Sequence, residues 1–413
     1  MSETVSPARE AALYVLGRCR RFDAWSTQTM QAGFDRYQLS GRDTALCTRL
    51  CRSVLQNAAL CDFYIDAYCS QGVKRLQPQV LDVLRLGVCQ LLFLDRIPAS
   101  AAVNEAVSLC RRISPKAAGL VNAVLRRVAE HRDALPAISG EGTAAYLSLR
   151  HSHPLWLCEQ LVAEHGYDFA AAFLAANNEE ALLTVTMNPL RGAERVESVT
   201  LAGGGAVQSR EGFAEGRFFV QDGAAHASVL HADPRPGMRV LDGCAAPGGK
   251  SFLSAILMEN RGRIIACDLH EKKLRLIDEG AQRLGIDIIE TVPMDGSKPY
   301  ERFYESFDLV IADVPCSGLG VIRKKPEIRY KEREELARLP EIQLGILCGL
   351  SRCVKPGGTL HYSTCTILTE ENGGVVEAFL KEHPDFEREE EKTFWPHLDG
   401  TDGFYFCRMR RHA

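Results

Sequence analysis

The sequence lacks any uninterrupted apolar run long enough to span a membrane. Its most apolar stretch, residues 80–94, is broken by Asp82, Arg85 and Gln90, whereas a membrane helix needs about 20 predominantly apolar residues. Residues 1–7 also lack the basic and apolar regions of a signal peptide. We therefore expect a cytoplasmic protein without a membrane partner.

Cysteines at metal-binding spacing are also lacking. The chain has 15 cysteines, an odd number, with no Cys-x-x-Cys pair and no Cys/His cluster that suits zinc. Most lie in apolar segments such as residues 86–92, where a reduced thiol acts as a small core side chain. We therefore expect a reducing compartment and no metal. Two cysteines, Cys316 and Cys365, lie instead in polar turns.

The net charge of −4 is small but unevenly distributed. Residues 1–140 hold 18 Lys and Arg against 12 Asp and Glu, whereas the remaining residues hold 31 against 41. A basic module joined to an acidic one favours a polyanion partner for the first, although a solvated surface explains the excess equally well. The basic residues near the end of this module, a candidate phosphate-binding face, are Arg111, Arg112, Lys116, Arg126 and Arg127.

The apolar pattern predicts three domains. Residues 1–140 carry apolar side chains at helical spacing, for example Leu46, Leu50 and Val54, which predicts an all-helical bundle. After a loop rich in glycine and proline, residues 145–235 combine one amphipathic helix with two strand-like segments, 182–188 and 217–222. We expect this region to be a small α/β linking subdomain that leads into a catalytic domain.

Residues 236–413 alternate strands and helices, which predicts a doubly wound α/β sheet of the Rossmann-like type. The predicted strands are 239–241, 264–267, 288–292, 309–312 and 359–362, and the predicted helices are 250–258, 271–284, 340–353 and 374–382. Ligands on such sheets bind at the carboxyl ends of the strands. The polar residues discussed next all follow predicted strands.

A loop of small residues, 243–249, follows the first of these strands. Gly248 and Gly249 would let peptide N–H groups and a helix N-terminus approach a ligand. For a glycine pair alone, an ordinary strand-to-helix turn is the commoner interpretation. Asp268, about 20 residues later, is placed to accept hydrogen bonds from ribose hydroxyls, and Asp295 after the next strand is placed to meet an adenine amine.

Either aspartate alone is more often a solvated loop residue, but the three features at successive strand ends favour an adenosine cofactor. A dehydrogenase would carry G-x-G-x-x-G at the first turn, and that pattern is absent there. S-adenosylmethionine (SAM) therefore fits better than NAD. Cys316 and Cys365 follow two further strands in turns rich in Gly, Ser and Thr. One such cysteine is usually structural, but two beside a cofactor site favour a catalytic role.

The second half contains the motifs Asp242-Gly-Cys-Ala-Ala-Pro-Gly-Gly-Lys250, Asp313-Val-Pro-Cys-Ser-Gly318, Ser363-Thr-Cys365, Glu370-Glu-Asn372 and Asp402-Gly-Phe404. As a set they resemble the RNA cytosine-5 methyltransferases. The helical region before them resembles the NusB-type RNA-binding domain of the bacterial RsmB (Fmu/Sun) subgroup, chiefly at residues 119–127. That subgroup modifies small-subunit ribosomal RNA, and the resemblance covers nearly the whole chain.

This resemblance implies methylation of carbon 5 of a cytosine in RNA, most simply in 16S ribosomal RNA. It implies Cys365 as the nucleophile that attacks the base and Cys316 as the residue that assists product release. Asp313 is expected to interact with ring N3 of the base. The residues implied to bind SAM are Cys244, Ala245, Ala246, Pro247, Gly248, Gly249, Lys250, Asp268, Asp295 and Asp313. We expect a monomer, with Arg323, Lys324 and Lys325 lining the RNA groove.

Two other functions stay open. Methylation of an exocyclic amine is one, since Asp313-Val-Pro-Cys316 is similar to the Asp/Asn-Pro-Pro-aromatic motif. That motif needs an aromatic residue to stack on the base, and this function would leave Cys365 without a role. A non-catalytic RNA-binding factor in ribosome assembly is the other, suggested by the basic helical region. It does not explain the cofactor-like loop together with both cysteines.

Overall fold

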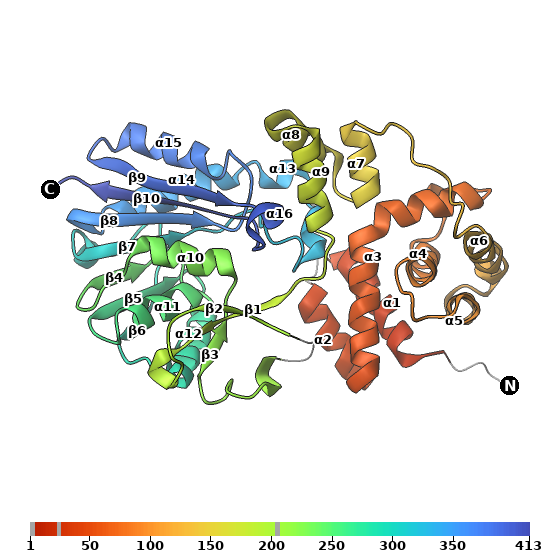
Figure 1. The fold of residues 1–413 in the computed structure, drawn as a ribbon, viewed down its shortest axis with the longest axis horizontal. Helices are drawn as coiled ribbons and strands as arrows, with labels where there is room; N and C mark the ends of the chain where they lie inside the picture. The colour runs from red at the N-terminus through yellow and green to blue at the C-terminus, as the bar shows by residue number, and fades with distance from the viewer. Residues whose placement is uncertain (1–4, 23–25, 203–206) are drawn as a thin grey trace. The chain divides into compact units, whose positions relative to one another are not determined.

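The computed structural model describes residues 5–22, 26–202 and 207–413. By their contacts they form two compact units, whose elements Figure 1 labels. The first unit comprises Met1–Glu179 and Lys324–Lys331, and the second comprises Glu180–Arg323 and Glu332–Ala413. Within the described ranges, no helix combines the length and the apolar character that a membrane span requires.

The first unit is helical, as the apolar spacing predicts. Leu50 and Val54 of the long helix α3 are buried one turn apart, in a core that also contains Leu125 of α6. A Cβ at Gly87 of α4 would lie 2.5 Å from Leu125, so the missing side chain lets α4 and α6 pack closely. The helices are α1 (Pro7–Phe22), α2 (Ser26–Arg36), α3 (Gly41–Tyr68), α4 (Pro78–Leu92), α5 (Ala99–Ile113), α6 (Ala118–Glu130), α7 (Ala144–His151), α8 (Leu155–His165) and α9 (Tyr167–Ala176), with 3-10 turns η1 (Val73–Arg75) and η2 (Pro115–Ala117).

A short segment from the second half of the sequence, Lys324–Lys331, also packs within the first unit. It forms the 3-10 helix η6 (Pro326–Tyr330), and its Arg329 is only 1% exposed. Arg329 donates hydrogen bonds to the Gln56 carbonyl at 2.7 Å and to Asn178 Oδ1 at 2.9 Å. Burial lowers the pKa of Arg329 to about 10. At neutral pH this side chain is therefore a buried cation held by neutral oxygen atoms.

Replacement of Arg329 by methionine is expected to lower the free energy of unfolding by about 3 kcal/mol, because buried oxygen atoms would lose their donors. Urea denaturation of the full chain, followed by the helical circular dichroism signal, measures this loss. The control is Arg126→Met on α6, where the arginine is exposed and a change below about 0.5 kcal/mol is expected. Equal unfolding midpoints for the two variants would contradict the prediction.

The second unit begins with a small antiparallel sheet of order β2-β1-β3. Its strands are β1 (Leu183–Met187), β2 (Ser198–Leu201) and β3 (Phe218–Val220). Strands at the β1 and β3 positions were predicted, and that prediction is confirmed. The linking region proposed at residues 145–235 is divided, however, because α7, α8 and α9 belong to the first unit. The Leu60 N–H donates to Ser152 Oγ at 3.1 Å, which ties the end of α7 to α3.

The main sheet of the second unit has seven strands in the order β6-β5-β4-β7-β8-β10-β9. Strands β4 to β8 pair in parallel, while β10 runs antiparallel to both β8 and β9. The five predicted strands are confirmed, whereas β9 and β10 were not predicted. The strands are β4 (Arg239–Asp242), β5 (Arg263–Asp268), β6 (Ile289–Pro293), β7 (Phe307–Asp313), β8 (Val354–Thr364), β9 (Phe386–Phe394) and β10 (Phe404–Arg411).

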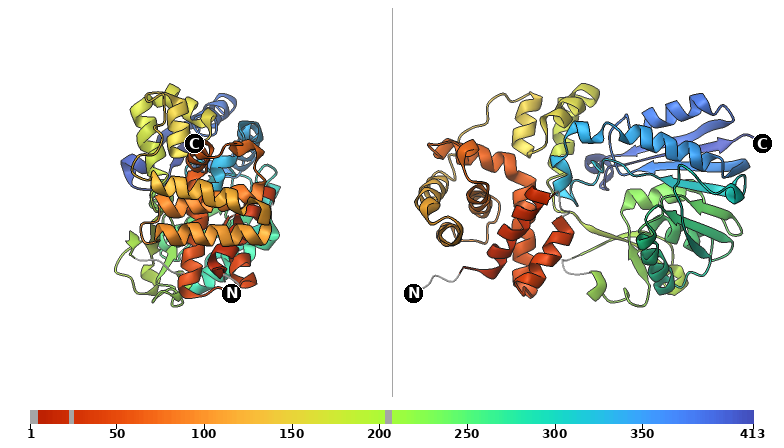
Figure 2. Two further views of the ribbon diagram at one scale, coloured as in Figure 1. Left: turned by 90° about the vertical axis from the view of Figure 1, so that its right-hand side faces the viewer. Right: turned by 180° about the vertical axis from the view of Figure 1, so that it is seen from behind.

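Helices cover both faces of this sheet, so a Rossmann-like α/β fold is confirmed (Figures 1 and 2). Val240 and Leu241 alternate between the faces: Val240 lies in a core with α10, α11 and α12, and Leu241 in a core with α14 and α15. The helices are α10 (Gly223–Ala232), α11 (Gly249–Leu257), α12 (Glu271–Leu284), α13 (Arg333–Leu336), α14 (Leu339–Ser351), α15 (Gly373–Glu382) and α16 (Pro396–Asp399), with 3-10 turns η3 (Pro189–Arg191), η4 (Val207–Ser209) and η5 (Glu301–Phe303).

Candidate active site

The loop between β4 and α11 exposes backbone where side chains would not fit. Gly248 has φ +111°, a conformation that favours glycine. A Cβ there would lie 2.4 Å from the Phe252 ring, and a Cβ at Gly243 would lie 2.4 Å from Leu350. Since α11 begins at Gly249, the loop offers bare peptide N–H groups and the positive end of a helix to a ligand.

Asp242 fixes the base of this loop. It ends β4 and is fully buried, and Ser251 Oγ in the first turns of α11 donates to its Oδ2 at 2.7 Å. Burial raises the pKa of Asp242 to about 7. The contact joins the strand to the helix on either side of the loop, so it holds the loop in shape. Asp242 is therefore a positioning group beneath the predicted cofactor site.

Two more aspartates follow the neighbouring strands. Asp268 ends β5, is 8% exposed, and accepts a hydrogen bond from the His270 N–H at 2.9 Å. Asp295 follows β6 and accepts from Ser297 Oγ at 2.7 Å and from its N–H at 2.9 Å; these bonds lower the pKa of Asp295. Because β4, β5 and β6 are adjacent and parallel, both aspartates lie along the same sheet edge as the loop.

Asp313, at the end of β7, is held from two sides. Its Oδ2 lies 2.5 Å from Lys250 Nζ, and its Oδ1 accepts from Ser363 Oγ at 2.9 Å. Lys250 Nζ also lies 5.0 Å from the centre of the Phe404 ring. Three of the sequence motifs thus meet at one carboxylate. The roles of Ser363 and Phe404 could not be predicted from the sequence, because their contacts depend on the pairing of β7 with β8 and of β8 with β10.

The two cysteines in polar turns lie side by side. Cys316 Sγ is 3.3 Å from Cys365 Sγ, although 49 residues separate them in the chain. Both thiols are partly exposed. The contact with Cys365, followed by burial, raises the pKa of Cys316. The predicted proximity of these cysteines at neighbouring strand ends is confirmed, and their chemical roles stay predictions.

A buried glutamate joins the two cysteine turns. Glu371 is 1% exposed, and its Oε2 accepts from the Ser317 N–H at 2.9 Å and from Gln343 Nε2 at 2.7 Å. Ser317 Oγ also lies 2.6 Å from Thr366 Oγ1. Ser317, next to Cys316, and Thr366, next to Cys365, are therefore hydrogen-bonded to each other, and Ser317 is also bonded to the Glu371 carboxylate. From the sequence, Glu371 was recognisable only as part of a motif, since its partners lie up to 54 residues away.

The last motif, Asp402-Gly-Phe404, packs against the same two cysteine turns. The Gly320 N–H donates to the Cys365 carbonyl at 3.0 Å, and the Gly403 N–H donates to the Gly320 carbonyl at 2.8 Å. A Cβ at Gly320 would lie 1.9 Å from the Gly403 oxygen. Only glycine permits this backbone contact, which explains why Asp402-Gly-Phe404 accompanies the cysteine motifs.

Of the three residues expected to line an RNA groove, Arg323 is buried, while the roles of Lys324 and Lys325 stay predictions. Arg323 is 7% exposed and lies 3.5 Å from Asp402, which is also buried. A buried arginine in an ion pair cannot reach a phosphate in solution, so its assignment to the groove was wrong. Lys325 is exposed and Lys324 is half-buried, and both belong to the segment that packs in the first unit.

The fold and the site together define a SAM-dependent methyltransferase. Its glycine loop leaves room where a Cβ would collide, and its carboxylates follow β5, β6 and β7, as the polar groups of an adenosine cofactor require. Residues 229–410 match the family described as 16S rRNA methyltransferase RsmB/F, and residues 6–130 match the NusB family. The chain belongs to the RsmB/F family of methyltransferases and carries a NusB domain.

Similar proteins cover nearly the whole chain. A protein of Bacillus subtilis (strain 168) named probable ribosomal RNA small subunit methyltransferase B is 36% identical, over 98% of each chain. A Klebsiella pneumoniae protein named ribosomal RNA small subunit methyltransferase B is 32% identical, over 90% of this chain and 91% of that protein. The structure also resembles the crystal structure of PH0851, with a TM-score of 0.81 and 24% sequence identity over 100% of each chain. This similarity supports the fold alone.

Proposed function

We propose that the protein methylates carbon 5 of a cytosine in small-subunit ribosomal RNA. The observation that carries this proposal is the 3.3 Å contact between Cys316 and Cys365 beside the carboxylate of Asp313. The names of the relatives support ribosomal RNA as the substrate. SAM would be held by the loop Cys244–Lys250 and by Asp268, Asp295 and Asp313. It supplies an electrophilic methyl group.

The chemistry of the base explains why a thiol is needed. Carbon 5 of cytosine is a poor nucleophile. A Cys365 thiolate that adds to carbon 6 forms an S–C6 bond and pushes the ring electrons to carbon 5, which becomes enamine-like and can take a methyl group. Addition also leaves negative charge on the ring, so ring N3 must take up a proton; Asp313, oriented by Lys250 and Ser363, would share that proton with N3.

Product release then needs a base. The proton at carbon 5 must leave, its electron pair must restore the C5–C6 double bond, and the S–C6 bond must break to return the Cys365 thiolate. Cys316, as the thiolate, would take that proton, since its sulfur lies next to the sulfur of Cys365. The target cytosine has to leave its stack to reach this edge of the sheet, as is usual for enzymes that act on bases.

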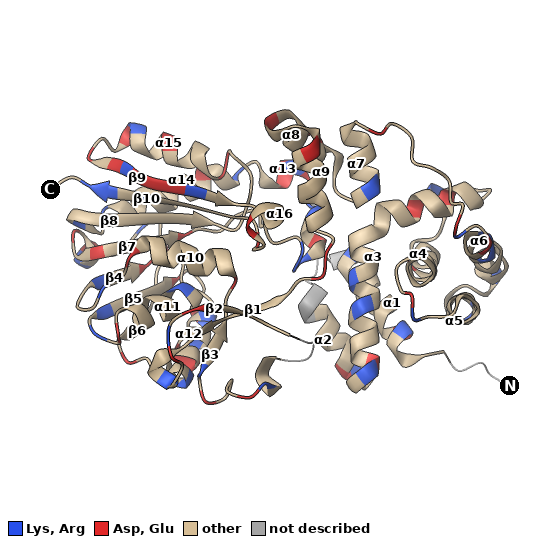
Figure 3. Ribbon diagram, viewed as in Figure 1, with Lys and Arg blue, Asp and Glu red and all other residues tan. Residues whose placement is uncertain are grey.

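The NusB domain would supply part of the RNA-binding surface. The five basic residues singled out in its sequence, on α5, η2 and α6, are all exposed, and Figure 3 marks the basic residues of the chain in blue. One of them, Arg112, also pairs with Glu10. Arginine and lysine side chains on a helical surface bind RNA through its phosphates. This surface therefore suits non-specific attachment to RNA, while the choice of cytosine is made at the active site.

The two alternatives explain less of the structure. Methylation of an exocyclic amine requires no cysteine, and would leave the pair of thiols and the Glu371 network beside them without a function. An assembly factor that only binds RNA would need neither the glycine loop nor the carboxylates that follow β5, β6 and β7. Both alternatives predict that no 5-methylcytosine is formed.

Purified protein with SAM is expected to convert one cytosine of unmethylated small-subunit rRNA to 5-methylcytosine. Bisulfite sequencing, in which 5-methylcytosine resists conversion, locates the product. The same RNA incubated without SAM is the control. Absence of 5-methylcytosine in both free rRNA and the assembled small subunit would contradict the proposal, and a methyl group on an exocyclic amine would favour the first alternative.

A further inference from the structure

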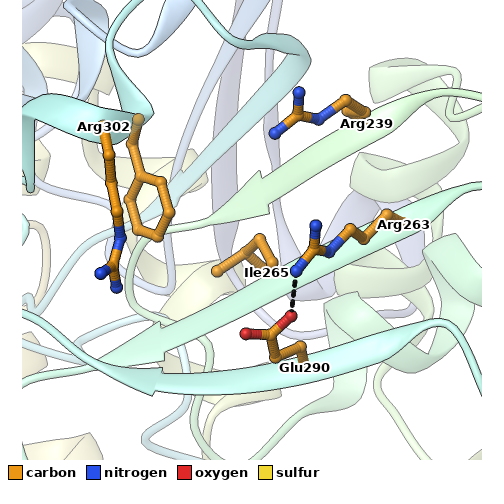
Figure 4. A pocket seen from close by; sticks show the side chains of 6 residues that line it. Arg239, Arg263, Ile265, Glu290 and Arg302 are labelled. Carbon is orange, nitrogen blue, oxygen red and sulfur yellow. Dashed lines mark hydrogen bonds and ion pairs between the residues drawn. The ribbon is translucent and has the colours of Figure 1, made fainter.

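A pocket opens at the beginnings of β4, β5 and β6, at the end of these strands opposite to the active site. Its volume is about 340 Å³, within the range of ligand sites in proteins. Figure 4 shows Arg239 and Arg263 on one side of it and Arg302 on the other. The lining residues, which we call the arginine pocket, are Arg239, Arg263, Ile265, Glu290, Arg302 and Phe303.

Strand register places these side chains on one face. Arg239 pairs with Arg263 across β4 and β5, and Ile265 pairs with Glu290 across β5 and β6. Alternate residues of a strand share a face, so Arg263 lies on the same face as Ile265, whose side chain belongs to the core beneath α14 and α15. The connection from β6 to β7, described throughout, contains the three-residue turn η5 in place of an α-helix. The sheet is therefore left open here.

The charge in the pocket is predominantly positive. Three arginines face one carboxylate, and that carboxylate, Glu290, is paired with Arg263. The Arg239 guanidinium lies 5.4 Å from the Phe307 ring centre, and that of Arg302 lies 5.1 Å from the Phe303 ring centre. Among the described residues, no carboxylate forms an ion pair with Arg239 or Arg302. Both side chains are exposed, so two guanidinium groups stay available to an anion.

We propose that the arginine pocket binds a backbone phosphate of the RNA substrate. This inference rests on the proposed function, which supplies the RNA. Guanidinium groups bind phosphate oxygens in a bidentate manner, and charge complementarity favours a phosphate over a neutral or cationic ligand. The pocket also gives residues 141–413, which hold 31 basic against 41 acidic residues, the local positive surface that binding RNA requires.

The pocket lies too far from the active site to touch the target nucleotide. From Arg263 to Asp268 the strand β5 advances about 17 Å. A phosphate bound in the arginine pocket therefore belongs to a nucleotide several positions from the target cytosine, or to another strand of the same folded RNA. The pocket would contribute affinity for a folded substrate and leave the chemistry of methyl transfer unchanged.

The test compares the full-length protein with an Arg239→Ala/Arg302→Ala double variant. Binding of a small-subunit rRNA transcript is measured at several salt concentrations with S-adenosylhomocysteine present. We expect a Kd about tenfold higher and a salt slope smaller by about 1 to 2, since one or two phosphate contacts are lost. The KM for RNA should rise, with kcat and the Kd for S-adenosylhomocysteine unchanged. Arg275→Ala, which removes one arginine that is 82% exposed on α12, matches the charge change of Arg302→Ala and should leave Kd and slope unchanged.

The outcomes separate this inference from the proposed function. If the wild-type protein methylates the transcript and the double variant keeps its Kd and salt slope, the arginine pocket does not bind RNA. If the wild-type protein methylates no RNA at all, the result contradicts the proposed function, on which this inference rests. Should the double variant unfold at a lower temperature than the wild type, Arg302→Ala alone carries the test. Arg302 lies in η5 outside the sheet, and an unchanged salt slope for this variant would overturn the inference.

Discussion

Cys365→Ala is expected to lower the rate of methyl transfer at least about a thousandfold and to form no covalent protein–RNA complex. Without a nucleophile at carbon 6, carbon 5 cannot gain the electron density that it needs to take the methyl group. Cys316 cannot substitute, because burial still raises the pKa of its thiol when Cys365 is removed. Transfer of a radiolabelled methyl group to the rRNA measures the rate.

Two controls separate loss of chemistry from loss of structure. The Cys365→Ala variant should bind S-adenosylhomocysteine with an unchanged Kd, because the proposed cofactor loop follows a different strand. Cys348→Ala, on α14, removes another partly exposed thiol and should keep full activity. Retention of more than about a tenth of the wild-type rate by Cys365→Ala would rule out Cys365 as the nucleophile.

The parallel part of the fold could be predicted from the sequence because its signals are local. Strands β4 to β8 are short apolar segments followed by turns, and α12 has the predicted bounds, 271–284. The edge strand β9 gave no such signal, because its sequence, Phe386–Phe394, is mostly charged. It is stabilised by pairing with β10, where Arg408 and Arg410 contact Glu389. Those partners are about 20 residues away, beyond the range of a local pattern.

The division into units shows a second limit of local reasoning. A linear sequence predicts domains as continuous segments. Segment 324–331 nevertheless leaves the second unit, packs in the first through Arg329, and returns. Lys324 and Lys325 of this segment were predicted to line an RNA groove together with Arg323; Arg329 was not part of that prediction, and it donates to buried oxygen atoms of its own unit. Whether a charged side chain becomes buried depends on its tertiary partners. These partners lie far away in the sequence, so a local pattern does not reveal them.

The site residues could be located from sequence to the extent that each follows a strand. Asp268, Asp313 and the two cysteines were placed at one sheet edge in this way. The supporting contacts could not be located, since Glu371 meets Ser317 across 54 residues and Gln343 across 28. Strand pairing decides such contacts. Residues proposed to touch the reacting atoms were therefore predictable as motifs, whereas the contacts that hold those residues in position were visible only in the structure.

Cys316→Ala is expected to trap the protein on its RNA, in contrast to Cys365→Ala. Attack by Cys365 and methyl transfer would proceed, but the proton at carbon 5 would lack the neighbouring sulfur, 3.3 Å from Cys365 Sγ, that is placed to remove it. In the wild type, the pKa of Cys316 is raised first by its contact with Cys365. When Cys365 becomes an uncharged thioether this cause weakens, which favours the Cys316 thiolate at the step where a base is needed.

The trapped complex should appear as a slower band of labelled RNA on a denaturing gel, at a yield approaching one RNA per protein, and only when SAM is present. The wild type should show little or none, since its adduct turns over. The Cys316→Ala/Cys365→Ala double variant should show none, because the S–C6 bond cannot form. A Cys316→Ala variant that methylates RNA at the wild-type rate without a slower band would show that another base removes the proton. In that case the 3.3 Å contact would serve to position Cys365.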